Sequence, residues 1–162
     1  YSLKDEPTCF QYGINLNTGI LLTGPIGCGK TSLMNLMKYL TATEHKFFVK
    51  PCRDISFEFI QDGYQIIHKY SNGKLYQSEP RTYCFDDLGT ENNLKYFGNE
   101  CNVMAEILLS RYDLFISKKL FTHITTNLSA TEIEKHYGNR VRSRLREMVN
   151  LIAFEKSTPD KR

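Results

Sequence analysis

One eight-residue stretch limits what this chain can fold into more than any other. It matches the pattern GxxxxGK[ST] at every fixed position and reads Gly24-Pro25-Ile26-Gly27-Cys28-Gly29-Lys30-Thr31. In this pattern the glycines let the backbone fold back, so that its N–H groups converge on phosphate oxygens beside the positive end of the following helix. We therefore expect Lys30 to reach the β- and γ-phosphates of a nucleotide and the Thr31 hydroxyl to bind Mg²⁺. The expected cofactor-binding residues are Gly24, Pro25, Ile26, Gly27, Cys28, Gly29, Lys30, Thr31 and Ser32.

The segments around this loop predict a strand before it and a helix after it. Residues 19–22 form a short apolar run, and residues 31–40 place their apolar side chains at helical spacing. Four further strands are expected at residues 46–49, 82–85, 120–126 and 151–154. Helices are expected between them at residues 54–70, 104–115, 129–138 and 141–148, the first of these weakened by a glycine at position 63. This alternation predicts a three-layer α/β domain around a parallel sheet.

Two acidic residues close the strand expected at 82–85. An acidic residue at the end of an apolar strand beside a phosphate loop holds the magnesium ion, and we assign that task to Asp86. Asp87 follows directly and is the candidate general base for an attacking water molecule. Asn127 ends the next strand, where its side chain can bond both that water and the γ-phosphate; the alternative is that it caps a turn.

A run of arginines follows on a predicted helix. Val141, Leu145 and Met148 define the buried side of that helix, and Arg144 borders it. A guanidinium held by a packed helix suits an arginine finger, which neutralises charge on a transferring phosphoryl group. A solvated face or a nucleic-acid contact is the alternative for these arginines.

Composition excludes several classes of protein. The chain has 162 residues, which is enough for one domain with a sizeable core, and a net charge of +3, which is well short of a dedicated nucleic-acid coat. Its apolar stretches are only a few residues long, so we expect no membrane partner. Its 5 cysteines have no disulfide or metal spacing and are typical of reduced thiols in a cytoplasmic protein.

Taken together, the motifs resemble those of the AAA+ ATPases, and within them the bacterial helicase-loader branch of the DnaC type with its transposition relative IstB. The resemblance covers roughly residues 19–162, an expected ATPase domain after an N-terminal stub at residues 1–18. It is carried by the strings Gly-Pro-Ile-Gly-Cys-Gly-Lys-Thr (24–31), Phe-Asp-Asp-Leu-Gly-Thr-Glu (85–91), Thr-Thr-Asn-Leu-Ser (125–129) and Arg-Val-Arg-Ser-Arg-Leu (140–145).

The resemblance implies a five-stranded parallel sheet in the order 5-1-4-3-2, a helical lid that is reduced or absent, and ATP with Mg²⁺ at the carboxyl ends of the strands. It makes Asn127 the sensor 1 residue and Arg144 a finger that acts on the nucleotide of a neighbouring subunit, so that the active unit is an oligomer. It implies slow ATP hydrolysis, since Asp87 stands where most AAA+ proteins have glutamate. The implied partners are a replicative helicase and single-stranded DNA.

Two other readings stay open at this point. A small P-loop phosphotransferase would suit the length and the fold class, and an IstB-like adaptor would use ATP and Mg²⁺ as an assembly switch. DNA phosphates could be neutralised by Arg111, Lys118, Lys119, Lys135 and the arginines at 140–146, for which solvated surface charge is the alternative.

Overall fold

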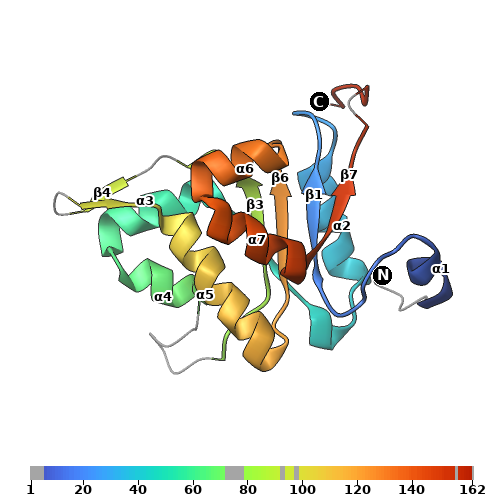
Figure 1. Ribbon diagram of the computed structural model, residues 1–162, viewed down its shortest axis with the longest axis horizontal. Coiled ribbons are helices and arrows are strands. Elements are labelled where there is room, and N and C mark those ends of the chain that lie inside the picture. Colours follow the sequence, from blue (N-terminus) through green and yellow to red (C-terminus); the bar gives the residue numbers. More distant parts are fainter. Residues whose placement is uncertain (1–5, 72–78, 92–93, 97–98, 156, 162) are drawn as a thin grey trace.

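A five-stranded parallel sheet forms the centre of the molecule (Figure 1). The computed structural model describes residues 6–71, 79–91, 94–96, 99–155 and 157–161. The strands stand in the order β2-β3-β6-β1-β7, and each adjacent pair is parallel. Their bounds are β1 (Gly19–Thr23), β2 (Phe48–Pro51), β3 (Tyr83–Leu88), β6 (Thr122–Thr126) and β7 (Val149–Ala153). Numbered along the chain these are strands 2-3-4-1-5, so the expected sheet order is confirmed.

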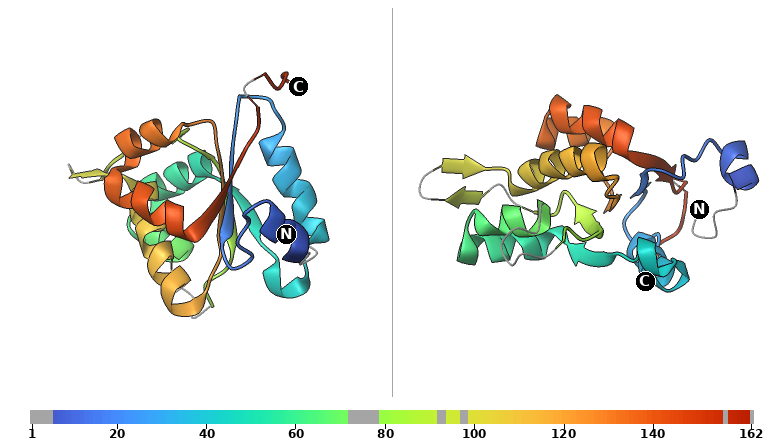
Figure 2. Two further views of the ribbon diagram at one scale, coloured as in Figure 1. Left: turned by 45° about the vertical axis from the view of Figure 1, so that its right-hand side comes forward. Right: turned by 90° about the horizontal axis from the view of Figure 1, so that it is seen from below.

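Helices cover both faces of the sheet, which makes the expected three layers (Figure 2). One face carries α2 (Lys30–Leu40), with α1 (Glu6–Gln11) and the short 3₁₀ helix η1 (Thr43–His45) beside it. The other face carries α3 (Cys52–Asp62), α4 (Gln65–Ser71), α5 (Val103–Lys118), α6 (Ala130–Tyr137) and α7 (Asn139–Met148). Two short strands that we did not expect, β4 (Leu94–Tyr96) and β5 (Asn99–Cys101), form an antiparallel hairpin that projects from this second layer (Figure 1).

The strands bury side chains on both faces, as strands between two helical layers must. Ile20 and Leu22 of β1 pack with Met34 of α2, whereas Leu21 between them belongs to the larger cluster under α3 to α7. The phosphate loop therefore extends from a strand that is fixed on both sides. None of the helices in the described ranges has the length and apolarity needed to cross a membrane.

The helix expected at residues 54–70 is two helices, because the chain turns at Gly63. The φ angle of Gly63 is 62°, in the left-handed region where a glycine carries no steric cost, and its N–H donates to the carbonyl of Phe59 at 2.9 Å. Helix α3 ends there and α4 begins two residues later.

Arg111 is buried between α5 and the central sheet and does not face solvent. Its side chain on α5 is 0% exposed, and its guanidinium stacks over Tyr83 and Phe85 of β3. The guanidinium donates hydrogen bonds of 2.6, 3.1, 3.0 and 2.8 Å, whose acceptors are Thr122 Oγ1 and the carbonyls of Tyr70, Arg81 and Phe121. Both alternatives considered for Arg111, contact with DNA phosphates and solvated surface charge, are therefore wrong, whereas Lys118, Lys119 and Lys135 are exposed.

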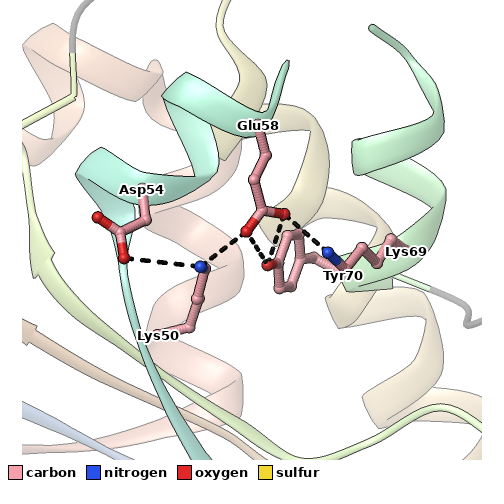
Figure 3. A network of polar contacts seen from close by, with 5 residues as sticks. All are labelled: Lys50, Asp54, Glu58, Lys69 and Tyr70. Carbon is pink, nitrogen blue, oxygen red and sulfur yellow. Dashed lines mark hydrogen bonds and ion pairs between the residues drawn. The ribbon is translucent and has the colours of Figure 1, made fainter. Parts of the chain in front are cut away.

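A polar network ties β2, α3 and α4 together (Figure 3). Glu58 of α3 accepts from Lys50 at 2.7 Å, from Lys69 at 2.8 Å and from the Tyr70 hydroxyl at 2.8 Å. Asp54 lies 3.6 Å from the same Lys50 ammonium. Partial burial acts to raise the pKa of Glu58, but the hydrogen bonds from Lys50, Lys69 and Tyr70 outweigh it and hold that pKa below its usual value.

Candidate nucleotide-binding site

The loop between β1 and α2 has the backbone that phosphate binding requires. Gly27 has φ 78° and Gly29 has φ 97°, both in the left-handed region that other residues rarely adopt. Helix α2 then begins at Lys30, so its positive end faces the loop. The motif, the preceding strand and the following helix thus occur in the order that the sequence predicted.

The side chain of Lys30 folds back into the phosphate loop. Its side chain is only 6% exposed, and its ammonium donates to the carbonyl oxygens of Gly24 at 2.9 Å and Pro25 at 2.8 Å. The cation is therefore held at the centre of the turn, where it can attract a phosphate group.

Asp86 lies beside this loop, two residues before the end of β3. Its carboxylate accepts from the Thr31 hydroxyl at 2.9 and 3.1 Å and from the Thr125 hydroxyl at 2.7 Å, and it is 5% exposed. A buried carboxylate next to a hydroxyl supplies the hard oxygen donors that Mg²⁺ prefers, with water and phosphate oxygens completing its shell. The residues expected for the metal thus fit it. Thr125 was not among the expected residues, although it stands in the Thr-Thr-Asn string.

A β-bulge aims Asp87 into the site. Phe85 pairs with Ile124 but Leu88 pairs with Thr126, so β3 carries one extra residue at this point. Asp87 adopts φ 55°, and its N–H donates to Thr125 Oγ1 at 2.9 Å. Neighbouring side chains on a regular strand point to opposite faces, and the bulge changes the direction of one of them. Both acidic residues can therefore serve one site.

A cavity of about 310 Å³ lies among these elements. This is the lower end of the size range of ligand pockets, roughly 300–1,000 Å³. Its wall consists of Ile26, Gly27, Gly29, Lys30, Thr31, Ser32, Asp87, Thr90, Asn127 and Lys161. Four of the expected nucleotide-site residues do not line this cavity. Three of them, Gly24, Pro25 and Cys28, belong to the phosphate loop, and the fourth, Asp86, accepts a hydrogen bond from Thr31.

Two residues in this wall were missed by sequence reasoning. Thr90 follows Asp87 and donates from its hydroxyl to the Asp87 carbonyl at 2.8 Å. Lys161 belongs to the polar tail after β7, and its backbone N–H donates to the carbonyl of Gly27 at 3.0 Å. The tail thus returns to the loop at the carboxyl end of the sheet (Figure 1).

Arg144 lies elsewhere. Its guanidinium stacks over the ring of Tyr112 at 4.7 Å from the ring centroid, on α7 where that helix meets α5, and it is not part of the cavity wall. Its neighbour Arg142 is paired with Glu134 of α6. The structure therefore brings the phosphate loop, both aspartates and Asn127 together but leaves Arg144 outside.

Solved structures share this fold. The DnaC helicase loader superposes with a TM-score of 0.63 at 19% identity, covering 91% of this chain and 85% of that one. A putative primosome component from Streptococcus pyogenes serotype M3 gives 0.63 at 19% identity over 95% of this chain and 77% of that one. DnaI superposes with a TM-score of 0.62 at 20% identity, covering 90% of this chain and 73% of that one. No family model matches the sequence, and no curated protein sequence matches it. The chain therefore has the same α/β fold as the DnaC helicase loader and DnaI.

Proposed function

We propose that residues 19–162 form an AAA+ ATPase domain that binds ATP with Mg²⁺, hydrolyses it slowly, and couples the ATP state to engagement of a replicative helicase or single-stranded DNA. One observation carries this proposal. The phosphate loop, the Thr31–Asp86 pair, Asp87 and Asn127 come from three neighbouring strands and meet around one cavity. The likeness of fold to the DnaC helicase loader supports the class of partner.

Each part of the site has a task in this proposal. The loop amides and the Lys30 ammonium bind the phosphates, and Thr31 with Asp86 holds the magnesium ion, which supplies charge neutralisation at the phosphate oxygens. Asn127 orients the attacking water, and Asp87 accepts its proton. Thr125 orients the Asp86 carboxylate relative to the backbone of Asp87, because its hydroxyl donates to the carboxylate and accepts the Asp87 N–H.

We assign Arg144 to the nucleotide of a neighbouring subunit. Its separation from the cavity of its own chain supports this assignment, as does the Tyr112 ring that fixes the guanidinium. An arginine finger, whether in the same chain or in a partner protein, raises phosphoryl-transfer rates by roughly 10³- to 10⁵-fold in well-studied cases. Hydrolysis would then require self-association.

The test measures ATP hydrolysis against protein concentration, with and without single-stranded DNA, using Lys30→Ala as the blank. We expect a rate per subunit that rises with concentration and a loss of that rate in Arg144→Ala. Arg140→Ala is the matched control, since Arg140 is an exposed arginine on the same helix.

Mixing two inactive variants makes the test sharper. Lys30→Ala keeps its finger and Arg144→Ala keeps its phosphate loop, so a mixture restores activity only if the arginine acts between subunits. A mixture that stays inactive, together with a wild-type rate strictly linear in concentration, would refute the assignment of Arg144.

The same assay separates the alternatives. Tight ATP binding with negligible turnover and no response to a replicative helicase would support the nucleotide-switched adaptor of the IstB kind. Transfer of phosphate to a nucleoside or nucleotide would support a phosphotransferase.

A further inference from the structure

Glu91 joins the loop after β3 to the end of α6, although the proposed chemistry gives it no task. One carboxylate oxygen accepts from the backbone N–H of Gly89 at 2.9 Å, and the other accepts from the hydroxyl of Tyr137. Tyr137 is 8% exposed. Burial, and then the charge of Glu91, raise the pKa of Tyr137, so its hydroxyl stays a donor to the carboxylate at all ordinary pH values.

The segment that Glu91 holds is the turn that presents Asp87. The Thr90 N–H donates to the Asp87 carbonyl at 3.1 Å and the Thr90 hydroxyl donates to the same oxygen at 2.8 Å, which closes a turn over residues 87–90. Asp87 has φ 55° in this turn. A left-handed conformation at a residue other than glycine persists only where the surroundings fix it.

The turn is fixed from two directions. Strand β6 holds its first half, since Thr125 bonds the Asp87 N–H and Thr126 donates to the Leu88 carbonyl at 2.6 Å. The second half is held by Glu91, which binds the N–H of Gly89. The Glu91 carboxylate is in turn tied to α6, an element that does not belong to the sheet.

We propose that Glu91 and Tyr137 are a positioning pair that holds the 87–90 turn, and with it the Asp87 carboxylate, in the geometry that ATP hydrolysis requires. This inference rests on the proposed ATPase function. Neither residue lines the cavity, so each acts through Asp87 and neither is a catalytic residue. If the bond is lost, Asp87 can leave the left-handed conformation, while the phosphate loop and the Thr31–Asp86 pair stay intact.

The fold offers a matched control for this bond. Tyr70 also donates its hydroxyl to a glutamate on another element, Glu58 of α3, and is also buried, at 3% exposed (Figure 3). Neither Tyr70 nor Glu58 lines the cavity. Tyr70→Phe and Tyr137→Phe each remove the hydroxyl of a buried tyrosine that donates to a glutamate. Comparing the two variants therefore separates the loss of a structural hydrogen bond from the loss of positioning.

The experiment measures kcat and KM for ATP at saturating Mg²⁺ for the wild type, Tyr137→Phe, Glu91→Gln, Tyr70→Phe and the Lys30→Ala blank, with unfolding temperatures for all. We expect kcat to fall about tenfold or more in Tyr137→Phe and Glu91→Gln, with KM changed by less than about twofold, because small misplacements of a reacting group lower the turnover step. Tyr70→Phe keeps kcat within about twofold. The double variant Glu91→Gln/Tyr137→Phe is no slower than the slower single variant, because both changes break one unit.

Each other outcome is decisive. Tyr137→Phe and Glu91→Gln variants that fold and keep the wild-type kcat would overturn the positioning inference but not the ATPase proposal. A fall in the kcat of Tyr70→Phe as large as that in Tyr137→Phe would do the same. A rise of KM at constant kcat would also overturn it, since the pair would then serve binding. A wild-type rate no higher than that of Lys30→Ala would overturn the ATPase proposal and this inference with it. Tyr137→Phe removes the donor, and Glu91→Gln replaces one of the two acceptor oxygens with an amide NH2, so the variants disturb the pair from both sides and either one that folds gives the result.

Discussion

Acid should destabilise this fold through one buried histidine. His123 lies on β6, is 3% exposed, and accepts the backbone N–H of Ile20 at its Nδ1 at 3.2 Å. Its ring packs against Phe47 with the centroids 4.7 Å apart. Burial lowers the pKa of His123 from 6.5 to about 4, and the positive charges of Arg111 and His45 act in the same direction. Protonation would also convert the acceptor of the β1–β6 bond into a donor.

The sign and size follow from these two pKa values. Between pH 6.5 and about 4 the unfolded chain binds a proton at His123 that the folded chain does not bind, so stability rises with pH across this window. The contribution is fully present above pH 6.5 and is lost as the pH falls toward 4. The full loss is about 3 kcal/mol, and between pH 7.5 and 5 it is about 2 kcal/mol.

Urea unfolding at pH 7.5 and 5 measures this loss, as a fall of roughly 1 M in the midpoint for a slope of about 2 kcal/mol/M. His123→Gln should remove most of this pH dependence, whatever its own stability at neutral pH. His136→Gln, a change at an exposed histidine on α6, should retain it. A wild-type midpoint that does not change between the two pH values would refute the reasoning, as would a His123→Gln variant with the full dependence.

Three further substitutions test other parts of the structure. Arg111→Lys keeps the charge but loses the planar fork that bonds three carbonyls and a hydroxyl, so it should lower the free energy of unfolding by about 2–4 kcal/mol in urea titrations. Thr125→Val removes the hydroxyl between the Asp86 carboxylate and the next backbone N–H; it should cost about 2 kcal/mol in thermal unfolding and weaken Mg²⁺-dependent ATP binding, whereas Thr125→Ser should retain both. Gly89→Ala should cost about 1–3 kcal/mol by calorimetry, since Gly89 has φ 104° and a Cβ there would lie 2.6 Å from the Leu128 side chain.

The five strands of the sheet could be predicted from sequence because each is a short run rich in apolar or β-branched residues, and three of them lead into a motif. Strand order followed from the resemblance, since spacing alone does not say which parallel strands are neighbours. The hairpin strands at residues 94–96 and 99–101 were missed because they have only three residues each, which is too few to show a reliable periodic pattern. The break at Gly63 was visible as a weakness, but a glycine inside an apolar helical pattern predicts lower stability rather than a turn.

The parts of the site that consist of consecutive residues could be predicted from the sequence. Gly24 to Thr31 and the Asp86-Asp87 pair belong to this class. The bulge that lets both aspartates serve one site was not predictable, because it is a property of the pairing of β3 with β6. The same holds for Thr125 and for the Glu91–Tyr137 bond, which joins residues 46 positions apart in the chain. Arg111 shows the opposite error, since an arginine on a helix is usually exposed, whereas this one is buried and bonds three carbonyls.

The cavity supports the proposal of an incomplete site in a single subunit. The cations in its described wall are Lys30 and Lys161, and the Lys30 ammonium already donates to two loop carbonyls. A transferring phosphoryl group spreads negative charge over three oxygens, and its stabilisation depends on cations placed before the reaction. Arg144 is held by Tyr112 outside this wall, which agrees with the proposal that it serves the nucleotide of another subunit. ATP binding and hydrolysis should therefore separate experimentally: under the proposed assignment of Arg144, binding should not depend on protein concentration, whereas the hydrolysis rate per subunit should rise with it.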